Sequence, residues 1–187
     1  MHIGKEQLKE LIEKKQIITD FESIEKQITA NGFDFRACAI VEITNAGKLA
    51  KEKKDNKKPE LGKAYILEEY TERLNNYDIK EKSNEKTVKL KGLKPYLIIS
   101  CEKVNTPENM MIHITPRSSL FRITQSLLGC SFGEAGYKGY MTFMLLPVLD
   151  CEIELGARIA QISFTQITGK ANYEEQNESN YQGGKLF

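Results

Sequence analysis

The sequence has few of the residues that build metal sites or disulfide bonds. Tryptophan is absent, histidine occurs twice, and no two cysteines form a CxxC pair. A structural zinc site needs four His or Cys ligands at characteristic spacing, so zinc is not expected. The four cysteines are expected instead as small buried hydrophobic residues in a reducing compartment, namely Cys38, Cys101, Cys130 and Cys151.

Long hydrophobic runs are also missing. No stretch reaches the roughly 18 apolar residues of a membrane span, and the N-terminus lacks the apolar core of a signal peptide. The sequence therefore predicts a soluble, cytoplasmic protein without a membrane partner.

Charge of one sign is not in excess. Lys and Arg total 27 and Asp and Glu total 26, which gives a formal net charge of +1. A near-neutral chain with few clustered aromatic residues is not typical of a nucleic-acid binder. Any anion that it binds should be small and held locally.

The 187 residues fit a single domain, 1–187, that can bury a hydrophobic core. Leu8, Leu11 and Ile12 recur at helical spacing, which predicts one short amphipathic helix over 5–15. A strand is expected from Phe33, after the turn-favouring pair Asn31-Gly32. Further strands are expected over 64–70, 86–91 and 96–100.

Residues 44–63 are rich in Lys and almost free of large apolar side chains. A solvated hairpin or crossover loop is the main interpretation of this segment, and a docking patch is the alternative.

From residue 110 onward, short apolar runs alternate with Gly and Pro. The runs are MMIHI, SLFRI, YMTFMLL, CEIEL and RIAQISF. Spacing near ten residues without a second long helical pattern predicts an all-β barrel or sandwich with one helix at its start. The polar tail, 170–187, is expected to be mobile unless a ligand or a neighbouring subunit orders it.

A run of arginines and hydroxyls, Arg117-Ser118-Ser119-Leu120-Phe121-Arg122, is suited to binding a phosphorylated nucleotide. Arginine offers a planar fork of donors that matches phosphate oxygens, and serine adds donors without bulk. The segment Gly136-Tyr137-Lys138-Gly139 follows, with an aromatic residue framed by glycines. Ordinary salt bridges and a packed strand aromatic are the alternative interpretations.

Five segments, in order, make the chain resemble the family of dCTP deaminases and trimeric dUTP diphosphatases. They are residues 24–37, with Asp34 between Gly and aromatics; 116–122; 134–139; 156–161; and 181–184. The resemblance covers most of the chain and is weakest over 44–90. It implies a mainly β fold, a distorted jelly-roll barrel of the dUTPase-like (β-clip) kind with a short N-terminal helix, and a homotrimer with active sites shared between subunits.

The resemblance also implies roles for residues. Ser118, Ser119 and Gln161 would contact phosphates, and Arg117 and Arg122 would neutralise charge or hold a neighbouring subunit. Tyr137 would pack beneath the deoxyribose, Gly136 beside it would also bind substrate, and Tyr181 and Gln182 would lie in a C-terminal segment that closes over the nucleotide. Segment 123–133 would recognise the base, although uracil and cytosine are not distinguished. Mg²⁺ would bind through the nucleotide phosphates, with Asp34 orienting one of its waters.

The chain departs from the family at the residue for deamination. The family uses a glutamate in the strand after the third motif, and here Met144 occupies that position. A thioether neither accepts nor donates a proton at neutral pH. Glu152 and Glu154 lie a strand further on and offer no replacement, so deamination is not favoured.

Hydrolysis of a triphosphate needs only a positioned water and stabilised phosphates. Glu134 stands where the family has the aspartate that orients this water, but its side chain is one methylene longer. A displacement of about 1 Å can cost around 10²-fold in rate. Three hypotheses remain: a dUTP diphosphatase that forms dUMP and pyrophosphate, a dCTP deaminase with or without coupled hydrolysis, and a nucleotide-binding regulator that has lost catalysis.

Overall fold

The computed structural model describes residues 1–176 and 181–187. The predicted N-terminal helix is confirmed as α1 (Lys5–Lys15), which buries Leu8, Leu11 and Ile12 and ends at Gln16 in the left-handed conformation. None of the helices in the described ranges is long and apolar enough to cross a membrane.

Strands make up most of the remaining regular secondary structure, as predicted. The elements after α1 are β1 (Ile18–Thr19), α2 (Ile24–Gln27), β2 (Phe33–Asn45), η1 (Lys53–Asp55), β3 (Glu60–Ile66), η2 (Glu68–Leu74), β4 (Ile79–Ser83), β5 (Thr87–Leu90), β6 (Tyr96–Asn105), β7 (Met110–Pro116), α3 (Ser118–Thr124), β8 (Ser126–Gly129), β9 (Lys138–Pro147), β10 (Cys151–Glu154), β11 (Arg158–Gln166) and η3 (Tyr173–Glu175).

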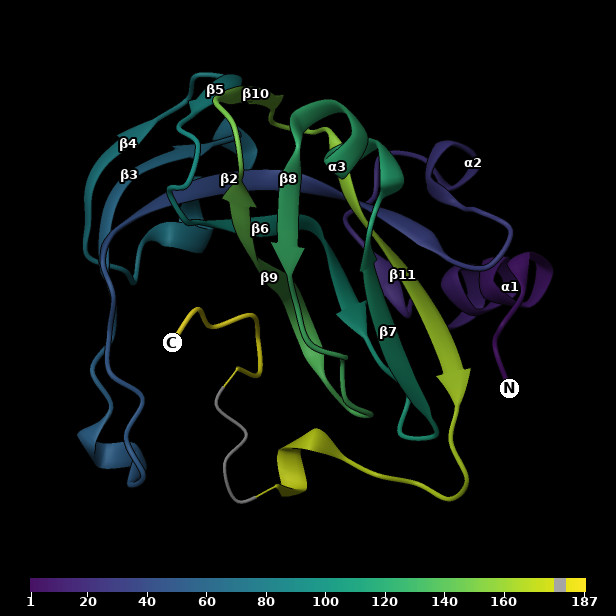
Figure 1. Cartoon of the computed structure of the whole chain (residues 1–187). Coiled ribbons are helices and arrows are strands. Elements are labelled where there is room, and N and C mark those ends of the chain that lie inside the picture. Colours follow the sequence, from purple (N-terminus) through teal and green to yellow (C-terminus); the bar gives the residue numbers. More distant parts are fainter. Residues whose placement is uncertain (177–180) are drawn as a thin grey trace.

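Nine strands form one jelly-roll-like sheet that does not close into a barrel (Figure 1). The strand order is β4-β3-β2-β6-β9-β8, and β11 pairs with both β2 and β7. The sheet has two halves, one around β11 and β7 and the other around β3, β6, β9 and β8. The long strand β2 joins them, because its first residues pair with β11 and the rest pair with β6 and β3. The mainly β, jelly-roll prediction is therefore confirmed, with an open rather than a closed sheet.

The core lies between the two halves of the sheet. Phe33, Phe35, Phe143 and Phe164 are fully buried there. On β9 the side chains alternate: Met141, Phe143 and Leu145 point into the core, and Tyr140, Thr142 and Met144 lie on the opposite face. Two of the four cysteines, Cys38 and Cys101, are buried as predicted, whereas Cys130 is exposed and Cys151 is partly exposed.

The run SLFRI, predicted as a strand, forms the short helix α3 instead. Pro116 ends β7, and Gln125 in the left-handed conformation ends the helix. A five-residue apolar run does not distinguish a helix from a strand by its pattern alone. Segment 64–70 also differs in part, because β3 ends at Ile66 and a 3₁₀ helix, η2, begins at Glu68.

Candidate functional site

A basic cavity of about 660 Å³ lies between α2, β2, the start of α3 and the turn that leads into β11. Four cationic side chains and one carboxylate line its wall. The lining residues are Glu22, Lys26, Gln27, Arg36, Arg117, Ser119, Gly156, Ala157 and Arg158. Two of the predicted phosphate-binding residues, Arg117 and Ser119, thus face the cavity.

Asp34 holds two of the arginines in place. Its Oδ2 lies 2.9 Å from Nε of Arg117 and 3.3 Å from Nη1 of Arg158. Burial raises the pKa of the Asp34 carboxyl group, while Arg117 and Arg158 oppose that shift. Two guanidinium groups on one carboxylate leave positive charge for an anion at the cavity wall.

A second buried carboxylate, Glu102, supports the same wall from beneath. Its side chain is fully buried, and it accepts hydrogen bonds of 2.7 Å from Nε of Arg36 and 2.8 Å from Nε2 of Gln27. Gln27 also donates to the Asp34 carbonyl oxygen, so the two carboxylate residues belong to one network. Burial raises the pKa of Glu102 even though Arg36 favours the charged form.

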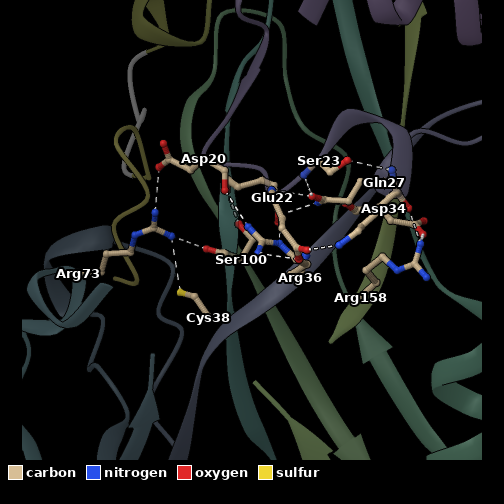
Figure 2. A network of polar contacts seen from close by, with 12 residues as sticks. Asp20, Glu22, Ser23, Gln27, Asp34, Arg36, Cys38, Arg73, Ser100 and Arg158 are labelled. Carbon is tan, nitrogen blue, oxygen red and sulfur yellow. Dashed lines mark hydrogen bonds and ion pairs between the residues drawn. The ribbon is translucent and has the colours of Figure 1, made fainter. Parts of the chain in front are cut away.

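The network continues away from the cavity to Arg73 (Figure 2). Arg73 donates to the Ser100 carbonyl oxygen at 2.6 Å and pairs with Asp20 at 3.0 Å. Its guanidinium lies between the rings of Tyr70 and Tyr140, 4.2 and 3.8 Å from their centroids. This stacking attaches the η2 segment to the outer face of β9.

Three predicted phosphate contacts do not line the basic cavity. Ser118 begins α3. The Gln161 amide donates to Thr29 Oγ1 at 2.8 Å. Arg122 lies over the Phe121 ring, 5.6 Å from its centroid.

A second cavity, of about 630 Å³, lies between the β8–β9 connection and the tail, and we call it the tail cavity. It contains the candidate catalytic residue Glu134 and the candidate sugar platform Tyr137. Its lining is Ser131, Phe132, Gly133, Glu134, Tyr137, Met141, Thr142, Tyr173, Gln176, Tyr181, Lys185, Leu186 and Phe187.

Glu134 and Tyr137 are both held by neighbours. Oε2 of Glu134 accepts a hydrogen bond of 2.5 Å from Nε2 of Gln176 in the tail. The Tyr137 hydroxyl donates to the Tyr140 carbonyl oxygen at 2.6 Å, and its ring meets Tyr173 edge-on at 5.6 Å between centroids. Burial raises the pKa of Tyr137, so its phenol is neutral at physiological pH.

The end of the chain is fitted closely to β9. The Gln182 side chain accepts from the Lys138 amide at 2.9 Å and donates to the Gly136 carbonyl oxygen at 3.3 Å, and the Gly183 amide donates to the Lys138 carbonyl oxygen. A Cβ at Gly184 would collide with the Tyr140 ring, so this approach requires glycine. Closure of this segment over a bound nucleotide stays a prediction.

Met144 lies beside the tail cavity, not in its wall. It shares one face of β9 with Thr142, which lines the cavity, and 45% of its surface is exposed. Within the described residues, the Thr142 hydroxyl is buried without a partner. This face of β9 therefore offers a hydroxyl and a thioether, and no carboxylate among Tyr140, Thr142 and Met144.

Within one chain, the predicted site residues do not lie in one cavity. Arg117 and Ser119 face the basic cavity, and Glu134, Tyr137 and Tyr181 face the tail cavity. Gly136 and Gln182 lie next to the tail cavity.

Among the residues that sequence reasoning missed are Glu102, which supports the basic cavity, and Tyr173, which lines the tail cavity. Glu102 could have been noticed as the one acidic residue of β6, which follows the apolar run Tyr96-Leu97-Ile98-Ile99. Tyr173 gave no signal beyond an aromatic residue in a polar tail.

The fit of the implied Mg²⁺ depends on which carboxylate oxygens are free. In 1–176 and 181–187 no three His, Cys, Asp or Glu side chains gather as a metal site. Asp34 Oδ1 is buried without a partner among these residues, whereas Oδ2 is taken by the arginines. A single free carboxylate oxygen could accept a hydrogen bond from a metal-bound water, so the residues present fit this role for Asp34.

Comparison with solved structures shows which fold this is. The 2'-deoxycytidine 5'-triphosphate deaminase from Agrobacterium tumefaciens has a TM-score of 0.61 and 14% sequence identity, covering 93% of this chain and 51% of that chain. This chain thus spans about half the length of that one. A mutant dUTPase from phage phi11 of S. aureus has a TM-score of 0.40 and 19% identity, over 50% of this chain and 80% of that chain.

The family follows from the sequence itself. The profile of the dCTP deaminase-like family matches residues 3–167, and the chain belongs to this family. A search of curated proteins finds no match.

Proposed function

We propose that this protein hydrolyses a deoxynucleoside triphosphate, dUTP, to dUMP and pyrophosphate. The observation that carries the proposal is the pairing of an acid with an aromatic platform in the tail cavity, where Glu134 and Tyr137 remain while Met144 replaces the acid needed for deamination. Family membership supports the substrate class.

In the proposed reaction Glu134 takes a proton from a water that attacks the α-phosphorus. The bond from that phosphorus to the oxygen bridging to the β-phosphorus breaks, and pyrophosphate leaves with the bridging oxygen. Arg117 and Ser119 bind the phosphates, and Tyr137 packs beneath the sugar. Mg²⁺ bound through the phosphates would neutralise part of their charge.

The proposed site is shared between copies of the chain in a homotrimer, because its halves lie in different cavities of one chain. Exposed apolar side chains around α3, β8 and β9 support an interface there, since patches of this kind mark association surfaces. They are Ile123, Leu127, Met144, Val148 and Leu149. The end of the strand order at β8 also leaves a sheet edge available.

Binding without turnover is the second candidate function. The Gln176 amide already occupies the Glu134 carboxylate, and Met144 cannot move a proton. A sensor or regulator needs the phosphate and sugar contacts but not the acid.

One experiment separates the candidates. The purified protein is incubated with Mg²⁺ and either dUTP or dCTP, and pyrophosphate and ammonia are measured separately. Pyrophosphate from dUTP without ammonia from dCTP is the expected result. Ammonia from dCTP would establish the deaminase, and calorimetric binding of dUTP without either product would establish the regulator.

A further inference from the structure

The Lys-rich segment between β2 and β3 is a folded ribbon, and we call residues 46–59 the lysine finger. Lys48 and Lys57 exchange both backbone hydrogen bonds at 2.9 Å, and the Asn56 side chain accepts from the Ala50 amide at 2.8 Å. Lys48 and Lys57 form one isolated β-bridge, and a Cβ at Gly47 would collide with the Lys57 carbonyl oxygen, so the two sides of the finger approach closely. In Figure 1 the finger, in blue with η1 at its tip, extends away from the sheet.

The finger carries an excess of positive charge. It carries six lysines, all exposed, and two acidic residues. Within the described residues Lys51, Lys54 and Lys58 form no ion pair. Lys48 and Lys57 stand directly opposite each other, and like charges at such positions destabilise a ribbon. An anionic partner would remove this repulsion.

We propose that the lysine finger binds the phosphate backbone of double-stranded nucleic acid. A two-stranded ribbon fits the width of the major groove, and lysines contact phosphates as point charges. Without aromatic side chains the finger has no stacking platform for a single strand. Binding through phosphates should depend little on base sequence, because phosphate contacts carry no sequence information.

Two other kinds of partner fit this chemistry less well. Lysine is depleted at the cores of protein interfaces, which favour aromatic residues and arginine. A membrane surface would need apolar side chains to insert, and Leu49 is the only large one on the finger, 91% exposed. The net charge of +1 argued against a nucleic-acid partner, but that value averages the finger with the more acidic remainder of the chain.

Fluorescence anisotropy with a labelled duplex of about 20 base pairs, at about 50 mM and 200 mM KCl, tests the proposal. With about four phosphate contacts, affinity should fall roughly 10²-fold between the two salt concentrations. The triple variant Lys51→Gln, Lys54→Gln, Lys58→Gln should bind at least about tenfold more weakly at the lower salt, with a salt slope smaller by about three.

The control is a second triple variant with the same loss of charge elsewhere: Lys5→Gln, Lys15→Gln, Lys80→Gln, all exposed. Its affinity should stay within about twofold of the wild type. Equal weakening by both triples, or no duplex binding at the lower salt, overturns the proposal. It is also overturned if vesicles of anionic lipid, but not the duplex, bind with dependence on the finger lysines. Nucleotide hydrolysis is not involved in any of these results.

Discussion

At the scale of single residues, Arg36 allows the stability contribution of a buried ion pair to be compared with that of an exposed one. It pairs with fully buried Glu102 at 2.7 Å and with half-exposed Glu22 at 3.7 Å. Glu102→Leu leaves the guanidinium without its buried partner and should lower the free energy of unfolding by about 3–5 kcal/mol. Glu22→Leu, the matched control, should cost much less, because solvent screens the exposed pair. Urea unfolding measures both, and equal costs would contradict the assignment.

A second residue-scale prediction concerns pH. Because burial raises the pKa of Asp34, the folded state favours the neutral carboxyl group relative to the unfolded chain. Its contribution to stability is fully present below the ordinary pKa of 3.8 and is lost as the pH rises through the raised value. Asp34→Asn cannot ionise, so its stability should increase relative to the wild type as the pH rises.

Urea unfolding of both proteins from about pH 4 to about pH 7 measures that difference. A difference that does not change with pH would show that burial and the two arginines cancel at Asp34.

At the scale of elements, the attachment of the tail to β9 depends on one glycine. Gly183 and Gly184 both have φ near +80°, but only at Gly184 would an added Cβ strike the Tyr140 ring. Gly184→Ala should therefore release residues 181–187 and speed hydrogen exchange at the Gly183 amide by about tenfold or more. Gly183→Ala carries the backbone strain without the collision, so exchange at the amide of residue 183 should speed up less. The same exchange rates in both variants would refute the role of the contact.

Elements with long periodic patterns were predictable from the sequence, and short ones were not. Leu8, Leu11 and Ile12 defined α1, and the β-rich run from Phe33 defined β2. The seven residues of α3 gave no decisive pattern, because only Leu120 among them is buried. For the candidate site, the motifs identified residues but not their partners. Arg36 and Glu102 are 66 positions apart, and no local pattern reports such a contact.

At the scale of the whole molecule, sharing of the site can be tested by mixing two inactive variants. Glu134→Gln removes the proposed catalytic acid, and Arg117→Gln with Ser119→Ala removes the proposed phosphate contacts in the basic cavity. If each site takes its acid from one copy and its phosphate contacts from another, an equal mixture unfolded and refolded together should recover about a quarter of wild-type dUTP hydrolysis. A mixture as inactive as its components would place the site within one chain, and light scattering should report a trimer for each variant.

The pairing of β2 with β11 constrains how the chain reaches this fold. Phe33 lies opposite Ile162, so the start of β2 pairs with a strand that is about 130 residues later in the chain. Contacts between such distant positions make folding slow, in the millisecond to second range. A ribosome stalled before residue 158 would hold a chain whose Phe33 and Phe35 face an incomplete half of the sheet. Truncated translation products of this protein should accordingly be prone to aggregate and dependent on chaperones.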